Sequence, residues 1–156
     1  DMHIVRAPGS SQWESAAPLP VARNSAASAV IDDSLHVVGG RTVARGNLDV
    51  HHIYDPQEDR WRDAAPMPLA QAGLAAAALH GRLYAFGGER FGENERVFPE
   101  SWVYNPATDA WTSLPDMPNP RHGLGAVTVG DHIYVIGGAL AVGGKRTTAL
   151  VDVFKP

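Results

Sequence analysis

The amino-acid sequence predicts an all-β protein made of repeated, four-stranded antiparallel sheets. Two adjacent glycines end an apolar run three times, and the second glycine of each pair stands at positions 40, 88 and 138, at steps of 48 and 50 residues. The 156 residues include 16 glycines and 12 prolines, which lie between short apolar runs as turn residues do in β proteins. A fixed period of this length is typical of a repeat architecture.

Four sequence markers keep the same register from one period to the next. Each glycine pair is followed by an aromatic-x-proline element, and the prolines at positions 8, 56 and 106 are each followed five residues later by a tryptophan and then by a proline-containing crossing. Near the N-terminus, Pro8 holds the place of the proline, and Arg6 stands where the aromatic residue belongs. The copies are Leu35–Gly40, Leu83–Gly88 and Ile133–Gly138 for the glycine pairs; Tyr54–Pro56, Tyr104–Pro106 and Phe154–Pro156 for the aromatic elements; Trp13, Trp61 and Trp111; and Pro18–Pro20, Pro66–Pro68 and Asp116–Pro118 for the crossings.

Each period reads as four short strands. In the first complete period we expect them at about residues 25–31, 35–39 and 50–54, and around Trp61. The first two strands are joined by a two-residue turn of a type whose residues accept positive φ in hairpins. The copies of this turn are Asp32-Asp33, His80-Gly81 and Gly130-Asp131.

Residues 69–79 are alanine-rich and by composition alone favour a helix. Their aligned copies, residues 25–31 and 123–129, are better strand formers. The repeat register therefore predicts a strand here, against the local propensity.

Composition excludes several classes of function. No cysteine is present, which removes disulfides, thiol nucleophiles and cysteine-metal sites and leaves the compartment open. The net charge of −4 argues against a surface that binds nucleic acid, and the longest apolar run, residues 74–79, is too short to span a membrane. His51 and His52 are adjacent on an expected strand and point to opposite faces, so we expect no metal site and no cofactor.

The glycine pairs, the spaced tyrosines and tryptophans and the period near 50 residues resemble the kelch repeat. Residues 47–56 and 121–125 are especially similar to bacterial kelch proteins. The resemblance implies that each period is one blade of a β-propeller, with its first strand nearest the central axis. Gln71 departs from the pattern, because Arg23 and Arg121 mark the other copies. Within a single domain, residues 1–156, we expect a partial blade at about 1–17, full blades at about 21–65 and 69–115, and a partial blade at about 119–156.

Three periods fall below the 4–8 blades that close a propeller, so we expect two open apolar flanks. We predict that a homodimer completes a ring of six blades. The segment around Trp13 then supplies the missing fourth strand beside residues 150–154 of the partner, and residues 1–8 are a surplus third strand. The alternative is that this chain is half of a longer one. The flanks are expected to expose Ile4, Val5 and Trp13 at one end and Val151, Val153 and Phe154 at the other.

Strand parity places the loops between strands 2 and 3, and between strands 4 and 1, on one face of the molecule. Eight of the 13 basic residues fall in these loops, whereas the turns on the opposite face are mostly acidic. A basic face attracts anions, and arginine grips a carboxylate or phosphate through two hydrogen bonds. The residues nearest the axis, and hence the expected ligand-binding residues, are Arg23, Asn24, Arg41, Gln71, Glu89, Arg90, Arg121 and His122.

These observations favour a non-catalytic binding or interaction module that takes an anionic or sugar-like ligand or a protein loop. No catalytic motif of the hydrolase, zinc-protease or phosphate-binding type occurs, so we expect no catalytic residue. One alternative is a sugar-processing enzyme, because some similar bacterial kelch proteins are sialic-acid mutarotases; Arg121 and Glu89 would then serve the reaction. Another is an engineered or truncated scaffold without a ligand.

Overall fold

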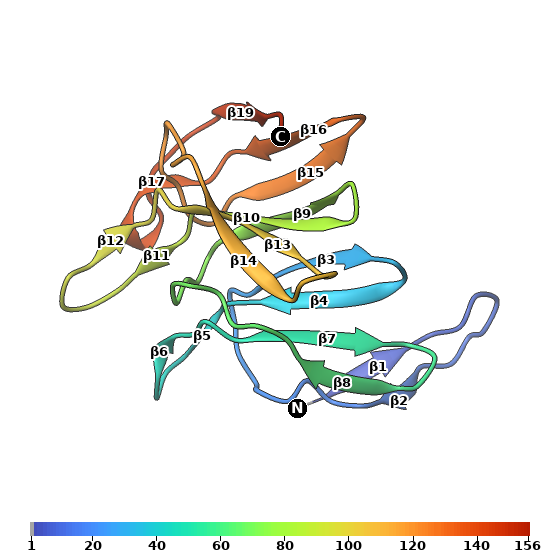
Figure 1. Cartoon of the computed structure of the whole chain (residues 1–156). Coiled ribbons are helices and arrows are strands. Elements are labelled where there is room, and N and C mark those ends of the chain that lie inside the picture. The colour runs from blue at the N-terminus through green and yellow to red at the C-terminus, as the bar shows by residue number, and fades with distance from the viewer. Residues whose placement is uncertain (1) are drawn as a thin grey trace.

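The computed structural model describes residues 2–156 and contains a row of antiparallel sheets, each corresponding to one blade. Strands neighbouring in the sequence are neighbours within each blade, and the blades follow one another through the molecule (Figure 1). Blade 1 consists of β1 (His3–Val5) and β2 (Glu14–Ala16); blade 2 of β3 (Ala27–Ile31), β4 (Ser34–Val38), β7 (His51–Asp55) and β8 (Arg60–Asp63); blade 3 of β9 (Ala75–Leu79), β10 (Arg82–Phe86), β13 (Ser101–Asn105) and β14 (Ala110–Leu114); and blade 4 of β15 (Gly125–Val129), β16 (His132–Ile136) and β19 (Val151–Phe154).

Small hairpins, which the sequence did not predict, interrupt the loops between the second and third strands. They lie outside the ladders of the blades and gather on one side of the molecule (Figure 1). They are β5 (Arg41–Thr42) with β6 (Gly46–Asn47), β11 (Glu89–Arg90) with β12 (Arg96–Val97), and β17 (Ala139–Ala141) with β18 (Lys145–Thr147), the last pair joined by the short 3₁₀ helix η1 (Val142–Gly144).

The turns between first and second strands have the expected geometry. Asp32 and Asp33 have φ of 46° and 61°, and His80 and Gly81 have φ of 51° and 68°. Positive φ at both central residues is the type I′ pattern, which matches the twist of the strands that it joins. In the third copy only Gly130 has a positive φ.

The alanine-rich segment is a strand, as the repeat register predicted. In β9, Ala77 and Leu79 pack into the core shared with blade 4, while Ala76 and Ala78 pack against the core shared with blade 2. Both faces of this inner strand are therefore covered, and small side chains let the two neighbouring blades approach it closely. Tertiary packing here overrides helical propensity.

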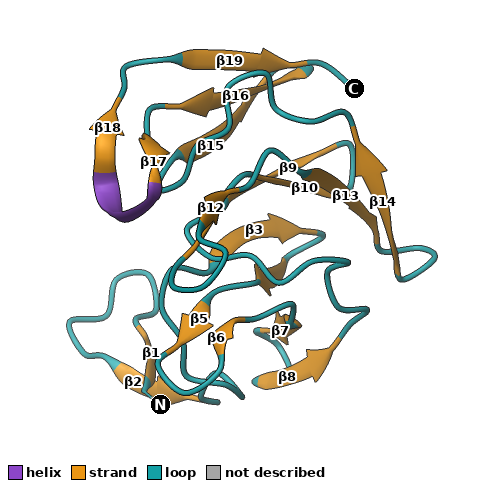
Figure 2. Cartoon of the chain, turned by 90° about the vertical axis from the view of Figure 1, so that its left-hand side faces the viewer, coloured by secondary structure: helices purple, strands orange, loops and turns teal. Residues whose placement is uncertain are grey.

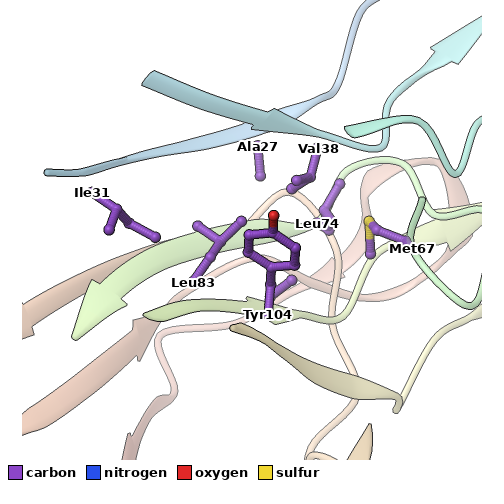
Figure 3. Packing of buried hydrophobic residues seen from close by; sticks show 8 residues of the cluster. Ala27, Ile31, Val38, Met67, Leu74, Leu83 and Tyr104 are labelled. Carbon is purple, nitrogen blue, oxygen red and sulfur yellow. The ribbon is translucent and has the colours of Figure 1, made fainter. Parts of the chain in front are cut away.

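Two apolar cores hold the blades together, one between blades 2 and 3 and one between blades 3 and 4. Figure 3 shows the first, in which Leu83 and Tyr104 of blade 3 face Ala27, Ile31 and Val38 of blade 2. Each core forms between sheets and not within one, so every blade depends on its neighbours, as in other repeat proteins.

Tryptophans reinforce these contacts between blades, as expected. Trp61 Nε1 donates a hydrogen bond of 2.7 Å to the carbonyl oxygen of Ala17 in blade 1, and Trp111 Nε1 donates one of 2.8 Å to that of Ala65 in blade 2. Trp13 differs, because 62% of its surface is exposed.

The N-terminal segment contains a strand that pairs within blade 1. β1 pairs with β2 over three residues, and the His3 ring lies 4.8 Å from the ring of Tyr54 in blade 2. β1 thus holds the place of a third strand in blade 1, within the segment that was expected to be surplus; Asp1 lies outside the described residues.

Both flanks of the row of blades expose apolar side chains. Ile4, Val5 and Trp13 are exposed at one flank and Val151 and Val153 at the other, while Phe154 is half-buried. Among residues 2–156, no helix is long and apolar enough to cross a membrane.

Candidate binding face

The three hairpins and the loops that enter the first strands lie on the same face, which we call the mouth face. Figure 2 looks onto it, with β5, β6, β12, β17 and β18 in front. Isolated β-bridges join the two kinds of loop at equivalent positions: Asn24 with Arg41, Ala72 with Glu89, and His122 with Ala139. Strand parity alone therefore placed these loops correctly.

The glycine pairs permit this close approach. Gly39 and Gly40 have φ of 63° and 99°, and a Cβ on Gly40 would lie 2.9 Å from the carbonyl oxygen of Asn24. The Gly40 amide donates a hydrogen bond of 2.9 Å to the carbonyl of Gln71 in blade 3. The glycines thus serve backbone conformation and contact between blades, as the sequence indicated, and leave room for no side chain.

Glu89 is the centre of the polar contacts on the mouth face. Its side chain is almost completely buried, and its Oε1 accepts hydrogen bonds of 3.1 Å from both terminal nitrogens of Arg41 in blade 2. The same oxygen lies 3.2 Å from His122 Nδ1 in blade 4, while Oε2 accepts a hydrogen bond of 2.9 Å from the Gly143 amide. One carboxylate therefore joins three blades, and Arg41, Glu89 and His122 are brought together as predicted.

Beside this network lies a cavity of about 550 Å³ between blades 2 and 3. Its lining contains three arginines and two asparagines but no acidic side chain. Arg41 lies over the ring of Phe91, with 4.5 Å from its guanidinium carbon to the ring centre. The residues that line the cavity are Asn24, Arg41, Thr42, Val43, Arg45, Gly46, Asn47, Leu69, Ala70, Arg90 and Phe91.

The arginines of this cavity differ in how far they are already engaged. Arg90 donates hydrogen bonds of 3.3 and 3.2 Å to the carbonyl of Asn94 in its own hairpin, and Arg41 is bound by Glu89. Arg45 is exposed, and its backbone amide bonds to Thr42 Oγ1. Arg45 is thus the arginine most open to an incoming anion.

Three of the predicted site residues serve the fold. Arg121 is fully buried and donates to the carbonyl oxygens of Gly137, Asn119 and Val135 and to the carboxylate of Asp152. Gln71 is equally buried; its Nε2 donates to the carbonyl of Gly87 and its Oε1 accepts from Trp102 Nε1, both at 2.7 Å.

Arg23 occupies the corresponding position in blade 2. It donates to the carbonyls of Val21 and Val37 and lies 3.0 Å from His52 Nδ1, and burial lowers its pKa. We name Arg23, Gln71 and Arg121 the strand pins, because each ties the start of a first strand to the second and third strands of the same blade. None of the three lines the cavity, and their side-chain donors meet protein acceptors except Arg23 Nε, which is buried without a hydrogen-bond partner among the described residues.

Where glutamine replaces arginine at position 71, the residue that it contacts on the third strand also differs from those in the other blades. The residue that meets the pin is His52 in blade 2, Trp102 in blade 3 and Asp152 in blade 4. A glutamine oxygen accepts from the indole, which an arginine does not. The departure from the repeat pattern at Gln71 is therefore compensated within the same sheet.

The structure leaves ligand binding as a prediction for Asn24, Arg41, Glu89, Arg90 and His122, which lie at or beside the cavity. Sequence reasoning missed Phe91 in the lining and Asn47, whose Nδ2 donates a hydrogen bond of 2.7 Å to the backbone carbonyl of Glu89. It placed Arg45 on the basic face but not among the ligand-binding residues. Arg45 and Phe91 belong to the hairpin loops, which carry no repeat signal.

A second polar cluster lies in the interior, away from the mouth face. His36 Nδ1 and His51 Nε2 are 2.9 Å apart, both side chains are buried, and the His51 ring lies 4.5 Å from that of Tyr104. Burial lowers the pKa of His36 to about 4 and that of His51 to about 3. His52 turns to the other face of the strand, as expected. In the part of the chain that is described, no three metal-ligating side chains gather into a possible ion site.

Comparison with known proteins agrees with this geometry. A family model described as the KLHDC2/KLHL20/DRC7 Kelch-repeats domain matches residues 4–138. A search of curated proteins gave no match.

Proposed function

Because this chain belongs to the kelch-repeat family, we propose that it is a non-catalytic interaction module that binds an acidic segment of a partner protein at its mouth face. Kelch domains generally mediate protein interactions. The observation that carries the choice of ligand is the cavity of about 550 Å³ whose lining has three arginines and no acid.

The charges around the cavity support an anionic ligand. Glu89, which is not part of the lining, is held by Arg41, His122 and the Gly143 amide, so it neutralises the charge of one of the three lining arginines, Arg41. Arg45 remains exposed at the rim. Arginine forks bind carboxylates through paired hydrogen bonds, and a cavity of one charge sign raises the local concentration of the opposite sign.

The mutarotase alternative gains no support from the contacts of its two named residues. Arg121 is fully buried and bonded to acceptors of its own blade, and both carboxylate oxygens of Glu89 accept hydrogen bonds or face His122. Both groups are thus already engaged by contacts within the protein. A scaffold without a ligand remains the outcome to be expected if the binding test below fails.

We further propose that the chain works as a homodimer. The exposed apolar side chains on its two flanks, such as Trp13 and Val153, support this assembly because open patches of this kind usually mark association sites. A ring formed by two copies would place two basic cavities on one face.

A fluorescently labelled hexaglutamate peptide is the probe for the mouth face. We expect binding that weakens strongly when the salt concentration rises from 50 to 300 mM, on the order of tenfold, because the contacts are electrostatic. Arg45→Ala should lower the affinity by roughly three- to tenfold without changing the stability. The control is Arg60→Ala, an arginine in β8 that is also exposed but lies outside the cavity lining. Equal effects of the two variants, or no binding by the wild type, would contradict the proposal.

A further inference from the structure

Two of the hairpins on the mouth face expose an apolar side chain at the same place. Val43 follows β5 and Phe91 follows β11, each three residues after the second glycine of its pair. Val43 is fully exposed and 49% of the surface of Phe91 is exposed. Hairpin loops usually carry polar residues or glycine at such positions, so these two side chains are candidates for contact with a ligand. In the third hairpin the same place holds Ala141, which is half-buried.

Both exposed side chains line the basic cavity between blades 2 and 3. Val43 belongs to the hairpin of blade 2 and Phe91 to that of blade 3, and Leu69 and Ala70 add half-buried apolar surface from the crossing into blade 3. Ligand-binding cavities in proteins typically combine apolar walls with a few polar groups that fix orientation. The cavity therefore offers an apolar wall in addition to its positive charge.

Arg41 holds the ring of Phe91 in place. Its guanidinium carbon lies 4.5 Å from the ring centre, within the range of a cation–π contact. Both of its terminal nitrogens donate hydrogen bonds of 3.1 Å to Glu89 Oε1, and Nη2 also donates one of 3.2 Å to Ser25 Oγ. On the side of the third hairpin, a Cβ on Gly143 would lie 3.8 Å from Phe91 Cε1. Because the ring is held from two sides, little conformational entropy is lost when a ligand covers it.

The open charge lies close to the apolar pair. Arg45 is exposed and stands two residues after Val43 in the same loop, so their Cα atoms are at most about 7 Å apart. Alternate side chains on one face of an extended segment have a similar separation, about 7 Å. Arg90, held by the carbonyl of Asn94, directly precedes Phe91. An extended ligand can therefore reach the charge with one side chain and the apolar pair with another that lies one or two positions away.

We infer that the mouth face selects segments in which an acidic residue stands one or two positions from a large apolar residue. The acidic side chain pairs with Arg45, and the apolar side chain lies against Val43 and Phe91. This inference rests on the proposed function and names the class of segment that the cavity takes. A purely acidic segment would leave both apolar side chains exposed to water and so lose the apolar part of the contact.

Two labelled pentapeptides of equal charge test the apolar contact. The first is Glu-Glu-Leu-Glu-Glu and the second is Glu-Glu-Asn-Glu-Glu, in which the central side chain has a similar size but is polar. We expect the leucine peptide to bind about tenfold more tightly, because a leucine side chain is partly removed from water. Raising the salt concentration from 50 to 300 mM should weaken both peptides by the same factor, since screening acts only on the shared charges. The preference for leucine should therefore persist at high salt.

Variants of the lining separate the apolar contact from the charge. Val43→Thr keeps the shape of a fully exposed side chain and should reduce the preference for leucine to about threefold, and Phe91→Ala should reduce it to about twofold. Arg45→Ala should weaken both peptides equally and leave the preference unchanged. The matched control is Val30→Thr, which alters an exposed valine of β3 outside the lining and should change neither affinity.

Each other outcome overturns the inference in a recognisable way. Equal affinities for the two peptides would overturn it, while a loss of both affinities in Arg45→Ala would leave the mouth-face proposal standing. A preference for leucine that survives both Val43→Thr and Phe91→Ala would place the apolar contact elsewhere. If Val43→Thr changed the sedimented mass but not the preference, a second copy of the chain, and not a peptide, would cover the apolar pair. Binding of neither peptide would overturn this inference and the proposed function together.

Discussion

Arginines near the mouth face fall into two groups that differ in what surrounds them. Arg121, a strand pin, is fully buried and bonded to three backbone carbonyls and Asp152, whereas Arg45, in a hairpin, is exposed beside a cavity. The pin stands directly before a first strand and is covered by its own blade; the hairpin arginine stands outside the ladder. Position relative to the strands, and not residue type, thus decides whether an arginine is buried by its own blade or left exposed beside the cavity.

The largest effect should come from removing a pin. Arg121→Ala leaves three carbonyls and Asp152 without their donor, and breaking a buried ion pair costs about 3–5 kcal/mol. Urea unfolding followed by tryptophan fluorescence measures this loss. Arg90→Ala is the matched control and should change the stability by less than about 1 kcal/mol. Similar losses for both variants would remove the distinction between pins and hairpin arginines.

The buried histidine pair makes the interior sensitive to acid. Histidines in the unfolded chain titrate near pH 6.5, whereas in the folded protein burial lowers the pKa of His36 to about 4 and that of His51 to about 3; Arg62 lowers both pKa values further, while Asp32 and Asp109 oppose the shifts. The unfolded state therefore binds more protons between these values, so stability is full above pH 6.5 and falls as the pH drops toward 4.

We expect a loss of roughly 2–4 kcal/mol between pH 7 and pH 4 from this pair. Thermal unfolding across this range measures it. His51→Phe, which keeps the aromatic contact with Tyr104, should flatten the pH dependence, whereas His80→Asn, a change on an exposed turn, should not. A slope that is equal in both variants would assign the acid sensitivity to other groups.

The smallest of these effects on stability is expected for Glu89, which contacts the hairpin residue Arg41 and also His122 of blade 4. Glu89→Gln removes the charge that faces Arg41 and His122 but keeps the shape, so the stability should fall by about 1–2 kcal/mol, since Arg41 is partly exposed. At the same time the released arginine charge should tighten hexaglutamate binding. A variant with unchanged stability and unchanged binding would show that the contacts of Glu89 influence neither the fold nor the affinity for hexaglutamate.

The fold was predictable from sequence because the repeat register identified strands that local secondary-structure propensity alone would have assigned wrongly. The alanines of β9 favour a helix by composition, and only their alignment with residues 25–31 and 123–129 indicated a strand. The site was less predictable. Residues that flank the glycine pairs could be placed on one face by strand parity, but the choice between Arg121 and Arg45 depends on side-chain packing, for which the sequence pattern carries no signal. The hairpins β5–β6 and β11–β12 escaped prediction because each strand has only two residues.

The hairpins have a consequence for how this surface can change. Each one is attached between a glycine pair and a third strand, and none of its residues pairs with a strand of the blade ladders. The third hairpin already differs from the others by the inserted η1 turn, while the ladder around it keeps the common register. Side chains at the hairpin tips can therefore change without altering strand pairing, as long as Arg41 and Glu89, which join the blades, are kept. The surface beside the cavity can thus vary on an unaltered framework.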